Sequence, residues 1–194
     1  MFRISILALF YLAFACSTAP KKEKALELVP DDTVRVVGLG IHDLSDLDTA
    51  AAVVSGFWGC PAVVRGSVPA SPDMYRDSAL MDYEVLYSLR KSGRFLYITD
   101  ELLFSDTVEL RGATLVWCNN MVVRGDLSFM RGTIIHEMGH LRGLEHCANL
   151  ACVMAVDNDE YDTGDLCAPC RKMVSLGMAA SVAECSVSVF GRRK

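Results

Sequence analysis

The feature that most constrains this chain is a run of three histidines that reads H-E-x-x-H-x-x-G-x-x-H. Its histidines are His136, His140 and His146. Residues four apart in a helix project from one face, so a helix would hold the first two imidazoles rigidly beside one ion. Gly143 tolerates the positive φ of a sharp turn, which would end the helix and bring His146 back as a third ligand. The run predicts a helix over 131–143 that carries a metal site.

The ligand types in this run predict which metal is bound and what it does. Three nitrogen ligands around a tetrahedral zinc leave one position for water, which is the arrangement of catalytic sites rather than structural ones. Glu137 follows the first ligand and is placed to hydrogen-bond that water instead of the metal. Zinc lowers the pKa of such a water towards ~7, and a carboxylate accepts its proton as the water attacks a carbonyl. We therefore expect a catalytic zinc, with Glu137 as general base and an amide bond as the target.

Cysteines and a methionine follow the third histidine at fixed spacing. They are Cys147, Cys152, Met154, Cys167 and Cys170. With the histidine run, they give H-E-x-x-H-x-x-G-x-x-H-C-x4-C-x-M followed by C-x-x-C. This pattern resembles that of the archaemetzincins, a family of metzincin zinc peptidases, over residues 133–172.

The archaemetzincin resemblance implies a role for each of these residues. It implies that the three histidines bind the catalytic zinc, that Glu137 is the base, and that Met154 lies beneath the zinc as the Met-turn. It also implies a second, structural zinc, whose ligands would be Cys147, Cys152, Cys167 and Cys170. Twelve residues separate Met154 from Cys167, fewer than is usual in the family.

Taken without the resemblance, the cysteines allow two interpretations. C-x4-C and C-x-x-C are zinc-binding spacings, and four thiolates make a closed structural site. An oxidising compartment instead favours disulfides, either within each pair or between the pairs. Both interpretations remain open at this point.

The first residues of the chain have the pattern of an export signal. Arg3 precedes an apolar run over 4–15, about half the ~20 residues that a membrane-spanning helix needs. The run ends in Ala-Phe-Ala before Cys16, which suits ordinary signal cleavage; it also resembles a bacterial lipoprotein signal in which Cys16 is lipidated. A buried N-terminal helix is the alternative. We expect a signal over 1–16 and a protein that is exported to the bacterial cell envelope, lipid-anchored there or secreted.

The remainder of the chain predicts a tether over 17–30 and one domain over 31–194. Strands are expected at 34–40, 62–65, 94–99, 114–118 and 121–123, with a turn at 119–120. Helices are expected at 46–54 (capped by Ser45 or Asp46), 77–91, 131–143 and 170–183. Alternation of strands and helices favours an α/β (α+β) fold with a partly parallel sheet. The resemblance implies a metzincin-like domain with a twisted, mostly parallel sheet, an antiparallel edge strand, an active-site helix and a C-terminal helix.

Charge and motif together narrow the function. The chain has 19 Lys and Arg against 24 Asp and Glu, a net charge of −5, and it has no basic block, so nucleic acid is not an expected partner. One hypothesis is a monomeric zinc metallopeptidase that acts on a peptide or protein and meets a membrane only through Cys16. The other is a non-catalytic, zinc-stabilised binding module of the cell envelope. Glu137 favours the peptidase, because a purely structural site needs no carboxylate placed for proton transfer.

Overall fold

The computed structural model describes residues 32–40, 43–89, 92–125, 127–156, 164–175 and 187–191. Its strands are β1 (Val34–Leu39), β2 (Ala62–Val68), β3 (Tyr75–Arg76), β4 (Ala79–Met81), β5 (Arg94–Thr99), β6 (Leu103–Ser105), β7 (Val108–Leu115), β8 (Asn120–Arg124) and β9 (Val187–Gly191). Its helices are α1 (Leu44–Trp58), α2 (Asp82–Ser88), α3 (Leu127–Leu141) and α4 (Ala168–Ser175), with 3-10 turns at Pro72–Met74 and Val116–Cys118.

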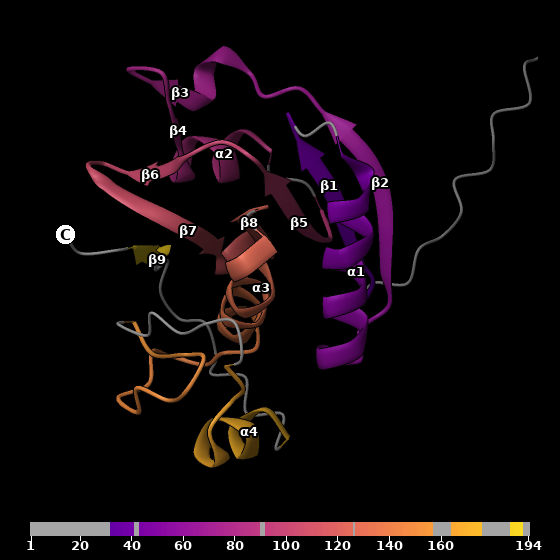
Figure 1. The fold of residues 1–194 in the computed structure, drawn as a ribbon, viewed down its shortest axis with the longest axis vertical. Helices are drawn as coiled ribbons and strands as arrows, with labels where there is room; N and C mark the ends of the chain where they lie inside the picture. Colours follow the sequence, from indigo (N-terminus) through magenta and orange to yellow (C-terminus); the bar gives the residue numbers. More distant parts are fainter. Residues whose placement is uncertain are drawn as a thin grey trace, which may run out of the picture.

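All nine described strands belong to one sheet, in the order β2-β1-β5-β8-β7-β6-β4-β3, and β9 also pairs with β7. The first four strands in this order, β2, β1, β5 and β8, are parallel to one another. Strand β7 pairs with β8 in antiparallel orientation. The predicted α/β fold with a mostly parallel sheet and an antiparallel strand is therefore confirmed (Figure 1).

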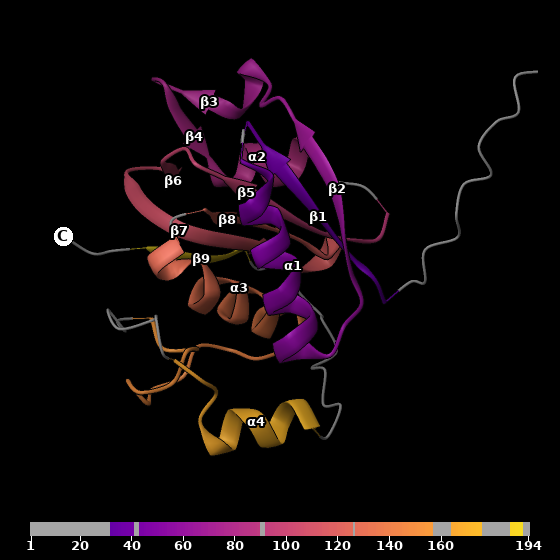
Figure 2. The same cartoon turned by 45° about the vertical axis from the view of Figure 1, so that its right-hand side comes forward.

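Helices cover the two faces of the sheet. Helices α1 and α3 pack on one face, where apolar side chains of β1, β5 and β8 meet them in a fully buried core. Helix α2 packs on the opposite face against side chains of β5, β7 and β8. Helix α4 lies beyond α3, away from the sheet (Figure 2). The arrangement leaves α3 between the sheet and α4.

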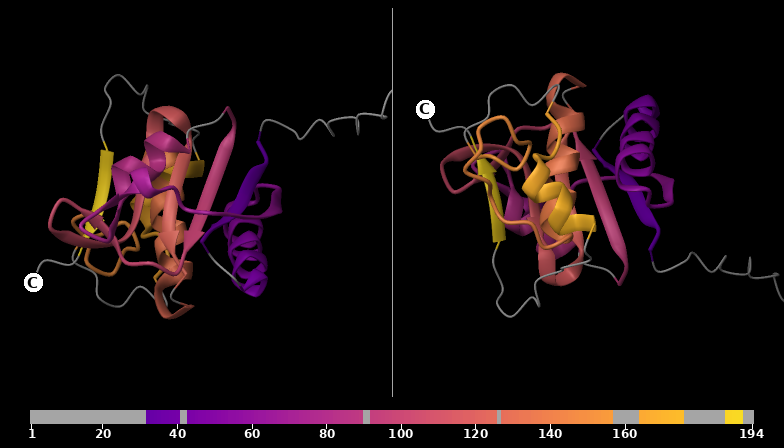
Figure 3. Two further views of the ribbon diagram at one scale, coloured as in Figure 1. Left: turned by 90° about the horizontal axis from the view of Figure 1, so that it is seen from above. Right: turned by 90° about the horizontal axis from the view of Figure 1, so that it is seen from below.

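Strand β9 covers the outer edge of β7. Leu110 pairs with Leu103 of β6 and also with Gly191 of β9, so these two strands flank β7 from opposite sides. The following stretch, 112–115, lies between β8 and β9. Figure 3 shows β9 at the end of the molecule opposite α1. The antiparallel strand that the sequence predicts as an edge is thus covered by a further strand, which the sequence analysis did not predict.

The start of α1 differs from the prediction. The helix begins at Leu44, and its cap is Asp43, whose carboxylate accepts a hydrogen bond from the Ser45 backbone N–H at 2.8 Å. The predicted caps, Ser45 and Asp46, both lie inside the helix. Asp43 is as good a cap residue by type as either of them, so residue type alone could not choose among the three.

The predicted helix over 77–91 is wrong in its first part. Asp77 and Ser78 have φ values of 50° and 68°, which makes a tight turn between β3 and β4. The chain then runs as β4, so the helix begins only at Asp82. The prediction rested on apolar spacing close to 3.6 residues. Two left-handed residues in a row cannot belong to a right-handed helix, and they override that pattern.

The other predicted elements occur near their expected positions. The predicted strand over 114–118 is in fact the end of β7 followed by a 3-10 turn, and Asn119 makes the expected turn with φ at 54°. The active-site helix runs over 127–141 instead of 131–143, and the C-terminal helix is described over 168–175. The predicted signal over 1–16, Cys16 and the tether over 17–30 lie outside the described residues. Within the described ranges, no helix has both the length and the apolar character needed to span a bilayer.

Candidate active site

Helix α3 places two of the three histidines inside the protein. His136 and His140 are 0% and 6% exposed, and they lie one turn apart on the helix. His136 Nδ1 lies 2.7 Å from the Val153 carbonyl oxygen, and His140 Nδ1 lies 2.8 Å from that of Leu144. A carbonyl oxygen can only accept, so each Nδ1 carries the proton and each Nε2 keeps its lone pair. Such backbone contacts orient metal-binding imidazoles and fix their tautomer.

The turn after α3 brings the third histidine to the same place. Gly143 adopts φ of 79°, as predicted, and its N–H donates to the His140 carbonyl. The exposed ring of His146 then lies 5.3 Å from the ring of His136 and 4.8 Å from that of His140, measured between centroids. The three candidate ligand atoms lie within 4.8 Å of one another.

The geometry of the three imidazoles fits zinc. The two Nε2 atoms of His136 and His140 are 3.0 Å apart, close to the roughly 3.3 Å between two ligands at ~2.05 Å from a tetrahedral zinc. Burial, and then the neighbouring His140, lowers the pKa of His136 to about 3. Burial also lowers the pKa of His140 to about 4 and lowers that of His146. All three rings therefore favour the neutral form that binds metal.

These lowered pKa values predict how zinc binding depends on pH. For an ordinary histidine with pKa ~6.5, the neutral fraction falls roughly eightfold between pH 7 and pH 5.5. Three such ligands would therefore lower the affinity for zinc several-hundredfold. With the pKa of His136 at about 3 and that of His140 at about 4, only His146 can add to the effect. We expect the zinc affinity of this site to fall less than about tenfold. Competition with a chromophoric chelator at both pH values, corrected for the chelator's own protonation, measures this; a several-hundredfold fall would contradict it.

Glu137 is held against the sheet by β7. Its side chain is 0% exposed, and the hydroxyl of Thr114 donates to Oε2 at 2.5 Å. The other carboxylate oxygen, Oε1, is buried without a hydrogen-bond partner. Burial raises the pKa of Glu137 to about 8, while the Thr114 hydrogen bond acts in the opposite direction. One oxygen of this carboxyl group is therefore anchored by Thr114, and the other has no hydrogen-bond partner.

The predicted Met-turn residue lies against the active-site helix. Met154 is completely buried, and a Cβ placed on Gly139 would come within 2.4 Å of its Sδ and 3.0 Å of its Cε. Gly139 is the second x of H-E-x-x-H, and it leaves the space that Met154 fills. Val153, next to Met154, supplies the carbonyl that accepts from His136. The methionine turn thus both packs on the helix and orients one of its histidines.

The four predicted cysteines come together in a second cluster. Their sulfurs lie within 4.8 Å of one another, and none of the four forms a disulfide in the described structure. Cys147 Sγ and Cys167 Sγ are 3.7 Å apart, which matches the roughly 3.8 Å expected between two sulfurs bound at ~2.3 Å to a tetrahedral zinc. A disulfide would hold them at ~2.05 Å. The short spacing between Met154 and Cys167 therefore still allows the four sulfurs to meet.

Backbone hydrogen bonds around the sulfurs join the two clusters. Burial raises the pKa of the Cys152 thiol, and the Cys167 N–H, which donates to Cys152 Sγ at 3.3 Å, acts in the opposite direction. The Cys147 N–H donates to the Met154 carbonyl at 2.9 Å. Cys147 also follows His146 directly in the chain. The cysteine cluster thus fixes the segment that carries both the third histidine and the methionine turn.

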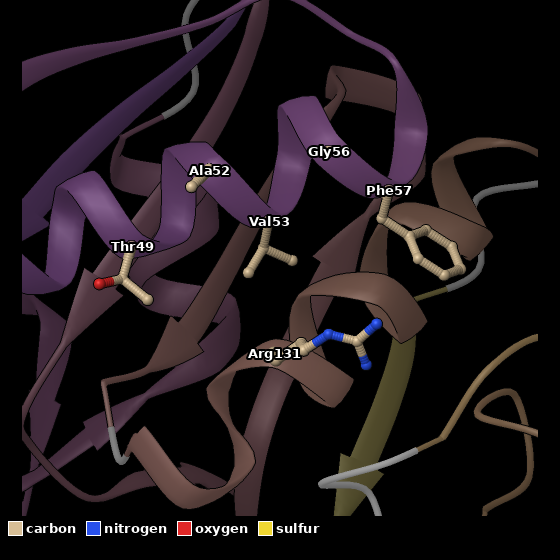
Figure 4. A pocket seen from close by; sticks show the side chains of 6 residues that line it. All are labelled: Thr49, Ala52, Val53, Gly56, Phe57 and Arg131. Atoms are coloured by element: carbon tan, nitrogen blue, oxygen red, sulfur yellow. The ribbon is translucent and has the colours of Figure 1, made fainter.

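A shallow hollow of about 350 Å³ lies elsewhere, between α1 and the first turns of α3 (Figure 4). It is lined by Thr49, Ala52, Val53, Gly56, Phe57 and Arg131. The Arg131 guanidinium lies 5.9 Å from the Phe57 ring centroid and donates to the Gly164 carbonyl at 3.5 Å. These contacts link α1, α3 and the segment before α4, and none of the histidines or cysteines of the two clusters lines the hollow.

Sequence reasoning missed the residues of β7 that contact Glu137. Thr114 was expected to lie in a strand but received no role, because it lies 23 residues before Glu137 in the chain and belongs to no motif. Gly139 lies inside the motif at a position where any residue is allowed. Only the packing of β7 and Met154 against α3 shows what these residues do.

Comparison with known proteins points to one family. Residues 128–175 match the model of peptidase family M54. The curated archaemetzincin of Pyrobaculum aerophilum is 49% identical over 43 residues, which cover 20% of this chain and 28% of that protein. The match thus spans little more than a quarter of the length of that relative.

Solved structures with similar folds include two archaemetzincins and a zinc-dependent peptidase. The archaemetzincin of Methanopyrus kandleri has a TM-score of 0.63 at 20% identity, covering 77% of this chain and 97% of that one. The archaemetzincin of Archaeoglobus fulgidus, solved with malonate, has a TM-score of 0.63 at 19% identity, covering 72% and 98%. A zinc-dependent peptidase of Methanocorpusculum labreanum has a TM-score of 0.53 at 19% identity, covering 73% and 99%. The chain is therefore archaemetzincin-like, with residues 128–175 matching peptidase family M54 and the described fold similar to that of solved archaemetzincins.

Proposed function

We propose that this chain is a zinc-dependent peptidase that hydrolyses amide bonds in a peptide or protein substrate. The observation that carries the proposal is the joint geometry of α3: three neutral imidazoles converge within 4.8 Å, and the neighbouring carboxylate keeps one free oxygen. A zinc ion held by the imidazoles would supply a Lewis acid that activates water and polarises the substrate carbonyl. The match to peptidase family M54 over this region supports the same activity.

The protein's own residues then have distinct tasks. His136, His140 and His146 would hold the metal, and the carbonyls of Val153 and Leu144 orient the first two imidazoles. Glu137 would accept the proton of the attacking water at Oε1 and return it to the leaving nitrogen. Oε2 would remain hydrogen-bonded to Thr114. The buried carboxylate with a free oxygen favours this enzyme over a non-catalytic binding module, which would gain nothing from it.

We further propose two zinc ions per chain. The four cysteine sulfurs lie within 4.8 Å of one another, with one pair at 3.7 Å, and four thiolate ligands would leave no open position on a zinc ion, which is typical of structural zinc. Export to the cell envelope remains part of the proposal, and it depends on the sequence of residues 1–16 alone.

Zinc analysis and peptide cleavage test the activity together. The full chain, purified under reducing conditions, is incubated with a library of random peptides, and new amino termini are identified by mass spectrometry. We expect the wild-type protein to cut a defined subset, and His140→Ala, purified in parallel, to lose one zinc per chain and all cleavage. Equal cleavage by the two proteins would contradict the proposal, because the hydrolysis would then owe nothing to this site.

A further inference from the structure

The contact between β7 and Glu137 assigns a role to a residue outside the motif. We propose that Thr114 is a positioning residue for the catalytic carboxylate, holding Oε2 of Glu137 so that only Oε1 is presented to the reacting water. This inference rests on the peptidase activity proposed above. It concerns a side chain that touches neither the metal ligands nor, by the proposal, the substrate, and that acts through Glu137 alone.

The first argument is the hydrogen bond itself. Thr114 is fully buried, and its Oγ1 lies 2.5 Å from Oε2 and 3.2 Å from the backbone oxygen of Glu137. A threonine hydroxyl has one proton, and the shorter contact with the carboxylate takes it. Both atoms are sealed from solvent, so no water competes for either of them. The bond therefore restrains the carboxylate more strongly than a similar bond at the surface would.

The second argument is that the carboxylate is bonded on one side only. Oε1 is as buried as Oε2 but has no hydrogen-bond partner. An unpaired buried oxygen costs free energy, so such atoms call for an explanation, and a site for a reactant is one. Anchoring one oxygen and leaving the other free sets the orientation of a general base before the substrate arrives.

The third argument is that β7 is shaped to receive this side chain. A Cβ on Gly112 would lie 3.1 Å from both Cγ and Oε1 of Glu137, and 2.6 Å from Cγ2 of Thr133 on the same helix. The strand thus passes so close to α3 that a side chain at 112 would displace Thr133 and Glu137, while two residues further along Thr114 donates to Oε2. The two residues of β7 together position the Glu137 side chain: Gly112 leaves space for it, and Thr114 donates a hydrogen bond to it.

Two substitutions separate the hydroxyl from the shape of the side chain. Thr114→Val keeps the branched shape and removes the donor, whereas Thr114→Ser keeps the donor and removes a methyl group. Hydrogen bonds to charged groups contribute roughly 1.5–3 kcal/mol, which corresponds to about a 10- to 100-fold change in rate. We expect Thr114→Val to lower kcat about 10- to 100-fold with KM unchanged, and Thr114→Ser to keep most of kcat. Zinc content should equal that of the wild type in both.

Binding of a tripeptide hydroxamate to the zinc-loaded protein gives a readout that needs no turnover. The hydroxamate group chelates zinc and hydrogen-bonds to the neighbouring carboxylate, so its affinity should fall in Thr114→Val and persist in Thr114→Ser. In a Glu137→Ala background, Thr114→Val should leave the affinity unchanged, because a residue that acts only through Glu137 loses its effect when Glu137 is absent.

Each outcome either supports or contradicts the positioning role of Thr114. Equal losses in Thr114→Ser and Thr114→Val, or an undiminished effect of Thr114→Val in the Glu137→Ala background, would overturn the positioning role while leaving the peptidase intact. Full activity in Thr114→Val would do the same. If the hydroxamate fails to bind the zinc-loaded wild type, the proposed function itself fails, and the role of Thr114 with it. If Thr114→Val loses zinc, Thr114→Ser is compared with the wild type instead. A kcat retained in Thr114→Ser supports the positioning role, and a lost kcat contradicts it.

Discussion

Glu137→Ala should lose hydrolysis by a factor of about 10² to 10⁴ while keeping zinc at the wild-type level, because general-base catalysis contributes rate accelerations of that order. The side chain is buried beside β7 and contributes no ligand atom to the three-histidine group. Its removal should therefore leave the metal in place and withdraw the proton acceptor. Initial rates on a peptide identified by library cleavage, together with zinc per chain by atomic emission, measure both quantities.

The matched control for this substitution is His140→Ala, which should lose the metal and the activity together. A Glu137→Ala protein that cleaves as fast as the wild type, with contaminating peptidases excluded, would eliminate the proposed mechanism. Loss of zinc in Glu137→Ala would instead show that the carboxylate supports the metal site.

Cys170→Ser should reduce zinc from two ions per chain to one and lower the free energy of unfolding by several kcal/mol. A structural zinc site exists only in the folded chain, so its binding free energy contributes directly to folding stability. Cys170 is buried at the start of α4, and its sulfur belongs to the four-sulfur group. Serine keeps the size of the side chain but gives zinc a much poorer ligand.

The effect should also reach the catalytic site. Cys147 directly follows His146 and donates its N–H to the Met154 carbonyl, so a disordered cysteine cluster frees the third histidine. We expect weaker binding of the remaining zinc in Cys170→Ser than in the wild type. Cys118→Ser is the control: Cys118 lies outside the cluster and donates to the Leu115 carbonyl, a bond that serine can also make. Two zinc ions retained by Cys170→Ser would favour the disulfide interpretation or idle thiols.

The sequence predicted the part of the site that lies on one continuous segment. His136, His140 and Glu137 follow from helical spacing, and Gly143 follows from the need for a left-handed turn, which its φ of 79° confirms. The roles of the four cysteines were open to two interpretations, and the structure brings their sulfurs within 4.8 Å of one another. Local rules suffice in these cases because each residue is positioned by its near neighbours.

Contacts between distant segments could not be predicted in this way. Thr114 contacts Glu137 only because β7 packs against α3 at the turn that carries Glu137. That position depends on how the whole sheet packs on the helix. The error over 77–91 has a different origin: Asp77 and Ser78 are both common turn residues, but the prediction followed the helical spacing of the later apolar residues, and in the β3–β4 turn both adopt left-handed conformations. Strand β9 has the alternating β-branched residues of a strand, but its short length gave no reason to place it beside β7.

The position of β9 has a consequence for any extended ligand of β7. Residues 112–115 are bordered by β8 on one side and β9 on the other, at the level where the strand contacts Glu137. A peptide that adds to this edge by main-chain pairing would have to exchange with a strand of the same polypeptide. Segments joined by a short linker compete at effective concentrations on the order of millimolar. Such a peptide would therefore compete with β9, and its apparent affinity would report the difference in free energy between the two strand pairings.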